Sequence, residues 1–407
     1  MNHKPTYLVM VTANNNNKFY RMIPNDNGSF TVEFGRVGAK CQTSSYPISQ
    51  WEKKYNEKVK KGYVDQTDLM EDLIKEVKPK TDKEYKTIVN KSIRTIVEYL
   101  QDRANKTIQK NYKVGAGDVT QAMVDKAQNK IDEMNKTLDS MSLSTFNNHL
   151  IELFGIIPRK MGKVNDFLAK SSDDYNDIMK HEQDLLDVMK TQVVQVSVQD
   201  DEDESESEAS QTILEAMDLQ FDEVSDEEIK HIKKLLGESS GKFSNAWKVT
   251  NNKTQKRFDE FVQNENITEI KELWHGSRNE NWWSIINTGL VLRPVNAVIT
   301  GKMFGIGTYF APKAQKSIGY TSLSGSYWAG GSERKAYMAI MKVAYGKPYN
   351  VHSFDSKYYS LNYNKLQDYC PGANCLHAHA GSMLRNDEIV IYKEEQCTIE
   401  YLVEITN

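Results

Sequence analysis

Hydrophobic and polar positions divide the chain into three stretches that differ in periodicity. In the first stretch, apolar runs with the short, turn-bounded form of strands are separated by the polar turns NNNN and PNDNG. These runs are YLVMV (7–11), KFYRMI (18–23) and SFTVEFGRVG (29–38). Residues 49–63 then place Trp51, Tyr55 and Val59 on one helical face. We therefore expect a small β-rich module that ends near Pro79.

The second stretch has the periodicity of amphipathic helices. Two apolar stripes recur at the spacing of a buried helical face. They comprise Ile93, Ile96, Val97 and Leu100, and then Met123, Ala127, Ile131, Met134 and Leu138. Asp118 is the candidate N-cap of the second stripe, and further helices are expected over 143–155 and 173–190. The stretch is predicted to be a helical domain, and we interpret its stripes as core contacts.

An acidic segment and a change of composition separate the third stretch from the helices. QDDEDESESEAS (199–210) holds seven carboxylates and can bury almost nothing, which is typical of a disordered linker. Beyond it the chain is richer in Gly, Tyr and Trp, and AYMAIMKVAYG, EIVIYK and TIEYLVEIT have the form of strands. Widely spaced strands with an occasional helix predict a mixed α+β domain.

The predicted fold is therefore multidomain α+β, with a small β-rich domain, an all-α domain and a mixed α+β domain. We expect these domains at residues 1–80, 82–195 and 211–407, with the acidic linker at 196–210. A length of 407 residues fits two or three domains.

Composition narrows the class of protein and its compartment. A hydrophobic content of 39% and a charged content of 27% are typical of a soluble globular protein. The sequence has neither an apolar run of membrane-spanning length nor an N-terminal signal pattern, so a membrane is not expected among its partners. The four cysteines do not form a disulfide framework, which indicates a reducing, intracellular compartment.

Charge is distributed unevenly along the chain. Residues 1–63 carry ten basic and four acidic side chains, a net charge of +6, whereas the whole chain has a net charge of −4. A basic N-terminal module on an acidic chain indicates contact with a polyanion. The alternative is a solvated, lysine-rich helix face, which charge alone leaves open.

Two motifs, LWHGSR (273–278) and GKMFGIGTYF (301–310), carry groups suited to an aromatic cation on a sugar diphosphate. Tyr309 and Tyr320 could stack on a pyridinium ring through aromatic and cation–π contacts. A glycine backbone amide and a serine hydroxyl could bind its carboxamide. A ribose would need a fixed partner such as His275.

Glu388 is the candidate group for the reacting centre. Departure of nicotinamide leaves positive charge on the ribose, which a buried carboxylate can stabilise. Glu388 begins the apolar run EIVIY, where an acid contributes little to packing. Singly, each residue has a simpler interpretation: His275 as a core histidine, the tyrosines as core aromatics and Glu388 as a surface charge.

The order of the motifs resembles the catalytic domain of the poly(ADP-ribose) polymerase family. The matching segments are LWHGSR, TGLVLRP, TGKMFGIGTYFAPKAQKSIGYTS and NDEIVIY, and they span most of residues 211–407. By this resemblance His275, Tyr309 and Glu388 match the family's His-Tyr-Glu triad. NAD is then expected as the substrate, and no metal is expected.

The resemblance implies how the chain would hold NAD. His275 would bind the adenine-side ribose, and Gly276 and Ser317 would bind the nicotinamide carboxamide. Ser277 is assigned to the NAD-binding residues as part of the same motif. Arg293 is the candidate contact for the adenine-side phosphate, since the family often has an arginine close to this point.

The resemblance also implies how the chain would react with NAD. Tyr309 and Tyr320 would enclose the nicotinamide ring. Glu388 would bind the nicotinamide ribose and polarise the attacking acceptor hydroxyl, a role associated with chain elongation as well as first transfer. Lys316 matches a family lysine beside the acceptor path.

The N-terminal stretch resembles the WGR domain, the DNA-sensing module of the family's shorter members. FGRVGAK (34–40) carries the similarity, with Phe34 in place of the signature tryptophan. An aromatic beside a strand-borne arginine can pack on a terminal sugar while the guanidinium binds a phosphate, so Phe34, Arg36 and Lys40 are the candidate DNA contacts. The helices of 82–192 resemble the family's helical regulatory domain, which would shield the NAD site until DNA is bound.

The function that this resemblance implies is transfer of ADP-ribose from NAD to protein acceptors, including the chain itself, with elongation of the product. DNA ends or nicks with a 5′ phosphate are the expected stimulus, and the expected location is the nucleus in a eukaryotic host, or otherwise the cytoplasm on nucleoid DNA. The alternatives are a mono-ADP-ribosyltransferase with the same triad and an inert scaffold that binds DNA ends.

A second cluster, CPGANCLHAHAG (370–381), has no role in this scheme. Its Cys370, Cys375, His377 and His379 are residue types that bind zinc, but their spacing is not that of paired zinc knuckles. Zinc binding, a role in the acceptor-side loop and no role at all remain open alternatives.

Overall fold

The structure, a computed structural model, describes residues 3–37, 39–70, 85–113, 119–200, 211–292, 303–381 and 384–407. The chain divides into two compact units, of which the first comprises Met1–Asp82 and Asn105–Ser197 and the second Lys83–Ala104 and Val198–Asn407. The division falls within helix α3 (Lys91–Asn111). Among the described residues, none of the helices combines the length and the apolar character that crossing a membrane requires.

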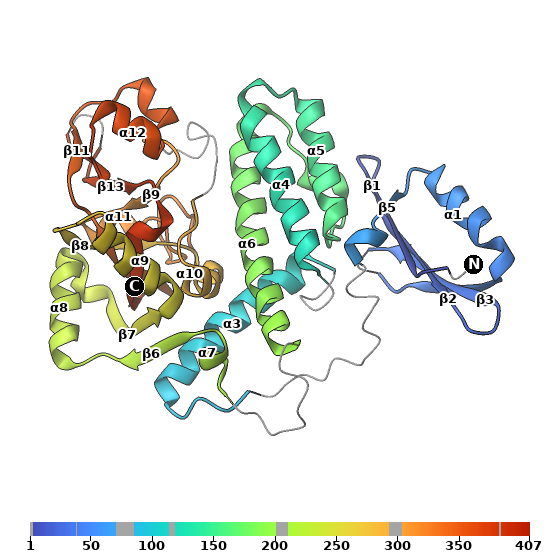
Figure 1. Ribbon diagram of the computed structural model, residues 1–407, viewed down its shortest axis with the longest axis horizontal. Coiled ribbons are helices and arrows are strands. Elements are labelled where there is room, and N and C mark those ends of the chain that lie inside the picture. The colour runs from blue at the N-terminus through green and yellow to red at the C-terminus, as the bar shows by residue number, and fades with distance from the viewer. Residues whose placement is uncertain are drawn as a thin grey trace. The chain divides into compact units, whose positions relative to one another are not determined.

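The first unit begins with an antiparallel five-stranded sheet. Its strands are β1 (Thr6–Thr12), β2 (Asn16–Pro24), β3 (Ser29–Arg36), β4 (Gln42–Pro47) and β5 (Val64–Asp65), in the order β4-β3-β2-β1-β5. Helix α1 (Trp51–Val59) follows β4 (Figure 1). The three predicted strands are confirmed, and β4 was missed because QTSSYP is polar and buries no side chain.

One face of this sheet packs against α1. Trp51 is buried and its ring contacts Phe30 at a centroid distance of 4.9 Å. The predicted stripe of α1 fades along the helix, because Tyr55 is half-buried and Val59 is 42% exposed. Burial of aromatic and aliphatic side chains on one face sets the register of the strands, since a slip of one residue would expose them.

Helices form the remainder of the first unit. They are α4 (Gln121–Thr137), α5 (Leu143–Ile156) and α6 (Tyr175–Asp200), together with the end of α3, and the first three run side by side in Figure 1. The predicted apolar stripe of α4 is buried, and so is that of the start of α3, which belongs to the second unit. The cap of α4 is Thr120, whose hydroxyl accepts from the backbone N–H of Met123 (3.1 Å). The predicted cap, Asp118, lies outside the described residues, and α6 continues through 196–200, which we had assigned to the linker.

A buried ion pair joins these helices. Arg159, which follows α5, donates two hydrogen bonds to Glu182 of α6 at 2.9 and 3.2 Å, and both side chains are at most 5% exposed. Its backbone carbonyl accepts from the buried Asn17 of β2 (2.8 Å), so the same residue contacts the sheet. Burial raises the pKa of Glu182, and Arg159 opposes that rise. Removing either partner would leave a buried charge without its counterion, which is strongly destabilising.

The second unit contains two sheets and short helices. Its strands are β6 (Leu219–Glu223), β7 (Phe243–Asn251), β8 (Ile270–Gly276), β9 (Thr308–Phe310), β10 (Lys335–Ala344), β11 (Pro348–Val351), β12 (Cys375–Ala378), β13 (Glu388–Ile391) and β14 (Cys397–Thr406). Its helices are the start of α3, α7 (Ile213–Ala216), α8 (Asp226–Leu236), α9 (Asn252–Asn264), α10 (Trp282–Thr288), α11 (Ala314–Ile318) and α12 (Tyr363–Tyr369).

The sheet orders are β6-β7-β14-β10-β8 and β11-β12-β13-β9. Neighbouring strands are antiparallel except β11 and β12, which are parallel. An antiparallel bridge between Trp274 of β8 and Ala311, which follows β9, joins the two sheets. The predicted strands in AYMAIMKVAYG, EIVIYK and TIEYLVEIT are confirmed as β10, β13 and β14, and so is the multidomain α+β fold class.

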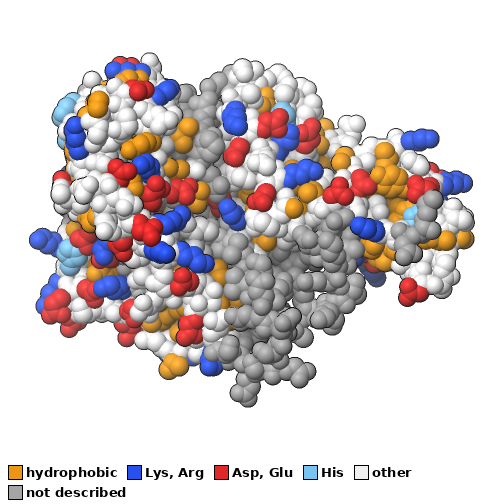
Figure 2. All heavy atoms as spheres, in the orientation of Figure 1, with side chains coloured by type: hydrophobic (Ala, Val, Ile, Leu, Met, Phe, Trp, Pro, Cys, Tyr) orange, Lys and Arg blue, Asp and Glu red, His pale blue; other side chains and the backbone are white. Residues whose placement is uncertain are grey.

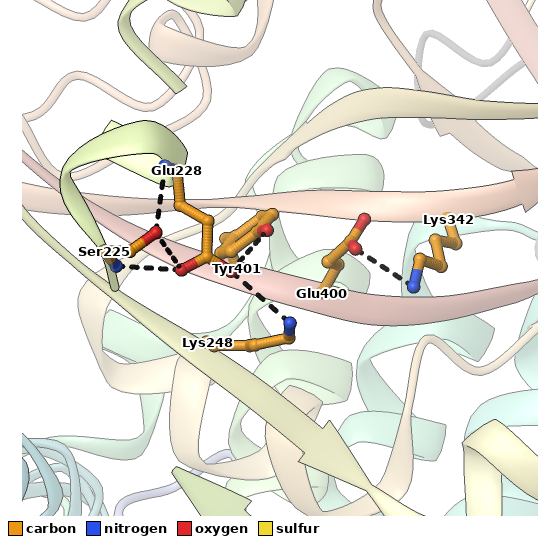
Figure 3. A network of polar contacts seen from close by, with 6 residues as sticks. All are labelled: Ser225, Glu228, Lys248, Lys342, Glu400 and Tyr401. Atoms are coloured by element: carbon orange, nitrogen blue, oxygen red, sulfur yellow. Dashed lines mark hydrogen bonds and ion pairs between the residues drawn. The ribbon is translucent and has the colours of Figure 1, made fainter. Parts of the chain in front are cut away.

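A polar network holds α8 on the larger sheet (Figure 3). Ser225 caps α8 and bonds Glu228, whose carboxylate also accepts from Tyr401 of β14 (3.0 Å) and Lys248 of β7 (3.4 Å). The Ser225 backbone N–H, helped by the Ser225, Tyr401 and Lys248 side chains, lowers the pKa of Glu228 to about 2 against the opposing effect of burial. The carboxylate is thus ionised at neutral pH, the form in which it accepts all these bonds.

Candidate active site

Strands β9 and β13 bring Tyr309 and Glu388 onto one face of the smaller sheet. Tyr309 pairs with Val390 in the antiparallel ladder, and Glu388 begins β13 two residues earlier. Because side chains alternate along a strand, Glu388 and Val390 share a face with Tyr309. The structure therefore brings together two of the three triad residues that the motif order predicted.

His275 lies beside this pair, at the end of β8. Its Nδ1 is 3.1 Å from the backbone carbonyl of Tyr309, and a carbonyl only accepts, so Nδ1 carries the proton. The centroid of the imidazole ring lies 5.9 Å from that of the Phe310 ring and 6.5 Å from that of the Trp282 ring. The bridge between Trp274 and Ala311 fixes β8 next to β9, and this explains how residues more than thirty positions apart meet.

Glu388 forms an ion pair with Lys316 of α11. The Lys316 Nζ is 2.8 Å from the Glu388 Oε1, and the side chains are only 15% and 12% exposed. Burial raises the pKa of Glu388, while the charge and hydrogen bond of Lys316 oppose that rise. Lys316, predicted to lie beside the acceptor path, is thus in direct contact with the predicted catalytic carboxylate.

The two tyrosines predicted to enclose a ring are close to Glu388 but have different surroundings. The Tyr309 hydroxyl donates to the Gly305 carbonyl and accepts from the Phe304 N–H, both at 3.0 Å. Burial raises the pKa of Tyr309 well above its usual value and that of Tyr320 to about 12, and the nearby Glu388 charge adds to both. Tyr320 is 37% exposed, so its ring is accessible.

Trp328 is a further aromatic at the site that the sequence analysis missed. Its ring stacks on Tyr320 with centroids 6.1 Å apart and an interplanar angle of 15°. Its backbone N–H donates to the Gly319 carbonyl (2.9 Å), which docks the loop on the end of α11. The available signal was the adjacent aromatic pair Tyr327–Trp328 inside a Gly/Ser-rich segment, and the structure leaves both side chains exposed.

Gly276 is required by the chain itself. A Cβ at this position would lie 2.0 Å from the Ser317 carbonyl oxygen, so β8 and α11 approach each other too closely for a side chain. Ser317 is 4% exposed and its hydroxyl donates to the Trp274 carbonyl (3.1 Å), which leaves oxygen lone pairs as acceptors. Ser277 accepts from the Asn281 amide (3.2 Å). These three of the predicted NAD-binding residues therefore lie at the junction of β8 and α11.

The glycines of GKMFGIGTYF allow close approach within the chain itself. A Cβ on Gly305 would meet the Leu361 carbonyl oxygen at 2.1 Å, and one on Gly307 would meet the Val390 side chain at 2.3 Å. Gly305 also has φ +76°, a conformation that favours glycine. The close approach at both positions is to the protein's own chain.

Arg293, the candidate for the adenine-side phosphate, and Gly301 both lie outside the described residues. The candidate DNA contacts Phe34, Arg36 and Lys40 are described. Phe34 is half-buried and its ring lies 5.9 Å from that of Tyr20, while Lys40 is exposed. Arg36 donates to Asn15 and to the Gly162 carbonyl.

Part of the basic charge of the N-terminal module serves packing. Lys58 lies over the Tyr20 ring (4.1 Å) and Lys54 over the Tyr46 ring (4.6 Å). Burial, followed by the charges of Lys61 and Lys54, lowers the pKa of Lys58. On the face in Figure 2, other basic side chains project from the module formed by β1–β5 and α1. Part of the lysine content of α1 is thus explained by packing on aromatic rings and by solvation of the helix face, the alternative to contact with a polyanion.

The four candidate zinc ligands separate into two groups. His377 and His379 lie together with Asp387, which the sequence analysis did not include. Cys375 is buried, its thiol donates to the Tyr345 carbonyl (3.2 Å), and burial raises its pKa to about 12. Among the described residues, the group that could hold a metal contains His377, His379 and Asp387 but neither Cys370 nor Cys375. Of the four residues that the sequence left open as zinc ligands, the structure therefore groups only the two histidines, and it groups them with Asp387.

The Lys316–Glu388 ion pair predicts how the pH dependence of turnover responds to Lys316→Met. Lys316 lowers a carboxyl pKa that burial raises, so its removal should raise the Glu388 pKa further. If the ionised form reacts, the acid limb of the pH profile of NAD consumption should move to higher pH. Lys313→Met, at an exposed position near the same helix, should leave the limb in place, and an unmoved limb in Lys316→Met would contradict the assignment.

Comparisons with known proteins agree with this geometry. Residues 226–407 match the poly(ADP-ribose) polymerase catalytic domain, and residues 5–70 match the WGR domain. The chain is 31% identical over 182 residues to the poly(ADP-ribose) polymerase-like protein 100L of Invertebrate iridescent virus 6, covering 44% of this chain and 94% of that protein. It is 32% identical over 186 residues to protein 101L of the same virus, covering 46% of this chain and 76% of the relative.

A longer match extends the similarity to the N-terminal part. The chain is 23% identical over 402 residues to poly(ADP-ribose) polymerase 2-A of Oryza sativa subsp. japonica. That match covers 87% of this chain and 59% of the rice protein. The catalytic-domain match covers the residues that hold Glu388, Lys316 and the tyrosines, and the WGR match covers the N-terminal sheet. The chain is therefore a member of the poly(ADP-ribose) polymerase family and an NAD+ ADP-ribosyltransferase.

Proposed function

We propose that this enzyme transfers ADP-ribose from NAD+ to protein acceptors, including itself, that it elongates the product into chains, and that DNA breaks stimulate it. The observation that carries the proposal is the buried carboxylate of Glu388, held by Lys316 on the same sheet face as Tyr309. A carboxylate there can act on both partners of the transfer, the ribose that loses nicotinamide and the hydroxyl that attacks it.

The chemistry assigned to these groups is a displacement at the ribose carbon that bears nicotinamide. The bond from this carbon to the nicotinamide nitrogen breaks, and its electron pair leaves with nicotinamide. Positive charge develops on the ribose, and the Glu388 carboxylate stabilises it. An acceptor oxygen then forms the new bond, and Glu388 assists loss of the proton from that oxygen.

The stacking and hydrogen-bonding groups would position the substrate. The accessible Tyr320 ring and the ring of Tyr309 are suited to a flat cationic heterocycle. The Gly276 backbone and the Ser317 hydroxyl, both at the junction of β8 and α11, are suited to a carboxamide. The charge and hydrogen bond of Lys316 would oppose the rise in the Glu388 pKa that burial causes.

Two alternatives differ in what this site produces. A mono-ADP-ribosyltransferase would use the same groups and stop after one transfer. An inert DNA-end-binding scaffold would be expected to lack a residue of the triad or a stacking tyrosine, yet His275, Tyr309, Tyr320 and Glu388 are all present. Chain elongation is preferred because Glu388 is able to polarise a sugar hydroxyl as well as a protein acceptor.

DNA sensing would act through Arg36. Its guanidinium donates to the Asn15 carbonyl and side chain, both at 2.8 Å, and to the carbonyl of Gly162 at 2.5 Å. Asn15 in turn accepts from the Val164 N–H (3.1 Å). A DNA phosphate that bound Arg36 would compete with the Gly162 carbonyl for the same donors. Phosphate binding would therefore loosen the segment between α5 and α6, which links the WGR domain to the helices.

Helix α3 offers a route by which the helical region would restrain the catalytic domain. Within the second unit, the Tyr99 hydroxyl accepts from the Asn279 amide (3.2 Å), and Asn279 lies four residues after His275. Arg103 forms an ion pair with Glu333, which precedes β10. These contacts tie the start of α3 to the segments that flank the predicted NAD site, and they support a shielding role.

Replacing Glu388 by Gln should separate binding from reaction. The amide keeps the shape but loses the negative charge, so chain formation should fall by at least about 100-fold while NAD+ binding changes little. Product length is read on a denaturing gel with labelled NAD+, and binding is measured by calorimetry. Glu395→Gln is the matched control and should retain chain formation. Long chains from Glu388→Gln would show that another group performs this role.

DNA stimulation is tested by adding DNA to the purified enzyme with NAD+. Nicked DNA with a 5′ phosphate should increase product formation several-fold over the rate without DNA, and the same nick with a 5′ hydroxyl should increase it less, because a phosphate contact is missing. Intact circular DNA is the control. If none of these DNAs increased the rate, DNA sensing would be rejected while the transferase assignment would stand.

The restraint by α3 predicts the effect of Arg103→Ala. Loss of the Glu333 ion pair should weaken the hold of α3 and raise the rate without DNA several-fold. Glu98→Ala, at an exposed position on the same helix, should not raise it. The two rates are compared at saturating NAD+ in the absence of DNA, and equal rates for Arg103→Ala and the unmodified enzyme would reject the restraint.

A further inference from the structure

A cluster of histidines and one carboxylate lies where the two inner strands of the smaller sheet, β12 and β13, meet at their ends. His377 belongs to β12, His379 follows that strand, and Asp387 immediately precedes β13. The antiparallel pairing of β12 with β13 brings the three side chains together although ten positions separate His377 from Asp387. One ligand atom from each lies within 4.8 Å of the other two.

Hydrogen bonds orient each of the three ligands. The Tyr345 hydroxyl bonds the His377 Nδ1 (2.8 Å), and the Asn350 Oδ1 accepts from the His379 Nε2 (2.8 Å). The Ala380 N–H donates to the Asp387 Oδ1 (2.8 Å). Partners on the outer atoms fix the tautomer and the ring orientation of metal-binding histidines, so this arrangement is that of a supported metal site.

The remaining atoms face one another. The Asp387 Oδ2 is 2.9 Å from the His377 Nε2 and 3.7 Å from the His379 Nδ1. Because the His379 Nε2 donates to Asn350, its Nδ1 presents a lone pair in the neutral ring. Two imidazole nitrogens and one carboxylate oxygen thus lie within 4.8 Å of one another.

The surroundings hold the rings and leave them accessible. His377 and His379 stack with centroids 4.0 Å apart, and His352 stacks on the other side of His379 at 4.4 Å. The side chains of His377, His379 and Asp387 are 12%, 29% and 35% exposed. In Figure 2, histidine side chains reach the surface beside the region of β11 and α12. An ion could therefore enter from solvent and keep water as a further ligand.

We propose that His377, His379 and Asp387 form a binding site for a divalent transition metal of the Zn²⁺ class. Two imidazoles with one carboxylate favour Zn²⁺, Co²⁺ and similar ions over Mg²⁺ or Ca²⁺, which prefer oxygen ligands. The site is independent of the DNA and chain-elongation proposals, because it depends only on these three ligands and their supports.

The expected role of the ion is to fasten β12 to β13. Asp387 is joined to Glu388 by one peptide bond, and consecutive side chains in extended chain point to opposite faces. The metal would therefore lie on the other side of the chain from the Glu388 carboxylate. Bound metal should stabilise the strand that carries this carboxylate without taking part in the transfer.

The test uses the full chain, stripped of metal with a chelator and titrated with Zn²⁺ alone. One equivalent per chain should bind, and the thermal midpoint should rise at saturation. Co²⁺ alone should give the visible d–d absorption of a nitrogen- and oxygen-ligated ion. Failure of both ions to bind at micromolar concentration would overturn the proposal.

Variants distinguish this site from a surface histidine pair or a cysteine site. His379→Ala should weaken Zn²⁺ binding by roughly 100-fold or more, since lost support groups alone cost 10–100-fold. Asp387→Asn, which retains the acceptor for Ala380, provides a second test if His379→Ala folds poorly. Unchanged Zn²⁺ affinity in a folded variant would overturn the site.

Two controls are matched to the alternatives. His231→Ala removes a histidine that is paired only with the Glu272 carboxylate (2.7 Å), and it should retain the bound equivalent. Cys370→Ser should retain it as well. Loss of Zn²⁺ binding in Cys370→Ser, with binding kept in His379→Ala, would assign the metal to the cysteines and reject the proposed ligands.

Discussion

The ion pair between Glu388 and Lys316 is the interaction on which the arrangement of the candidate active site depends. A carboxylate at the start of an apolar strand is costly to ionise, and burial accordingly raises its pKa. Lys316, presented by the short helix α11, offsets part of that cost at 2.8 Å. Because α11 also carries Ser317, whose backbone abuts Gly276 of β8, one short helix sets the position of the carboxylate and of the predicted carboxamide contacts together.

Close backbone contacts make this arrangement rigid. Gly276, Gly305 and Gly307 each approach another part of the chain at distances that would exclude a side chain. The Tyr309 hydroxyl donates to the Gly305 carbonyl and accepts from the Phe304 N–H, so both of these hydrogen bonds are to the same loop. The ring of Tyr309 is therefore fixed before any substrate arrives, which reduces the entropy lost on binding a flat heterocycle.

In the first unit, polar contacts connect the predicted DNA-sensing residues to the helices. Arg36 bonds the carbonyl of Gly162, and the buried Asn17 bonds that of Arg159. Arg159 is in turn held by Glu182 in an interior where neither charge is stable alone. A ligand that changed the partners of Arg36 would thus act on a segment whose geometry is linked to a buried ion pair, and this gives the WGR sheet a physical connection to α6.

The sequence alone determined the fold class, the order of the elements and the identity of the enzyme family. Apolar periodicity located α3 and α4 because their buried faces repeat at helical spacing, and a nearly continuous apolar run located β14. It missed β4, whose polar strand is held by backbone hydrogen bonds that leave no apolar pattern. The motif order predicted a triad of His275, Tyr309 and Glu388, although periodicity would not have separated His275 from an ordinary core histidine.

Only the tertiary structure decided which groups touch. It paired Lys316 with Glu388, stacked Trp328 on Tyr320, and replaced two cysteines by Asp387 beside His377 and His379. It also gave Gly305 and Gly307 neighbours from the protein's own chain. These contacts join residues far apart in sequence through strand pairing and close packing. Neither can be predicted from the local composition of the chain. The sequence thus determined which chemical groups were available, and the pairing of strands decided which of them could act together.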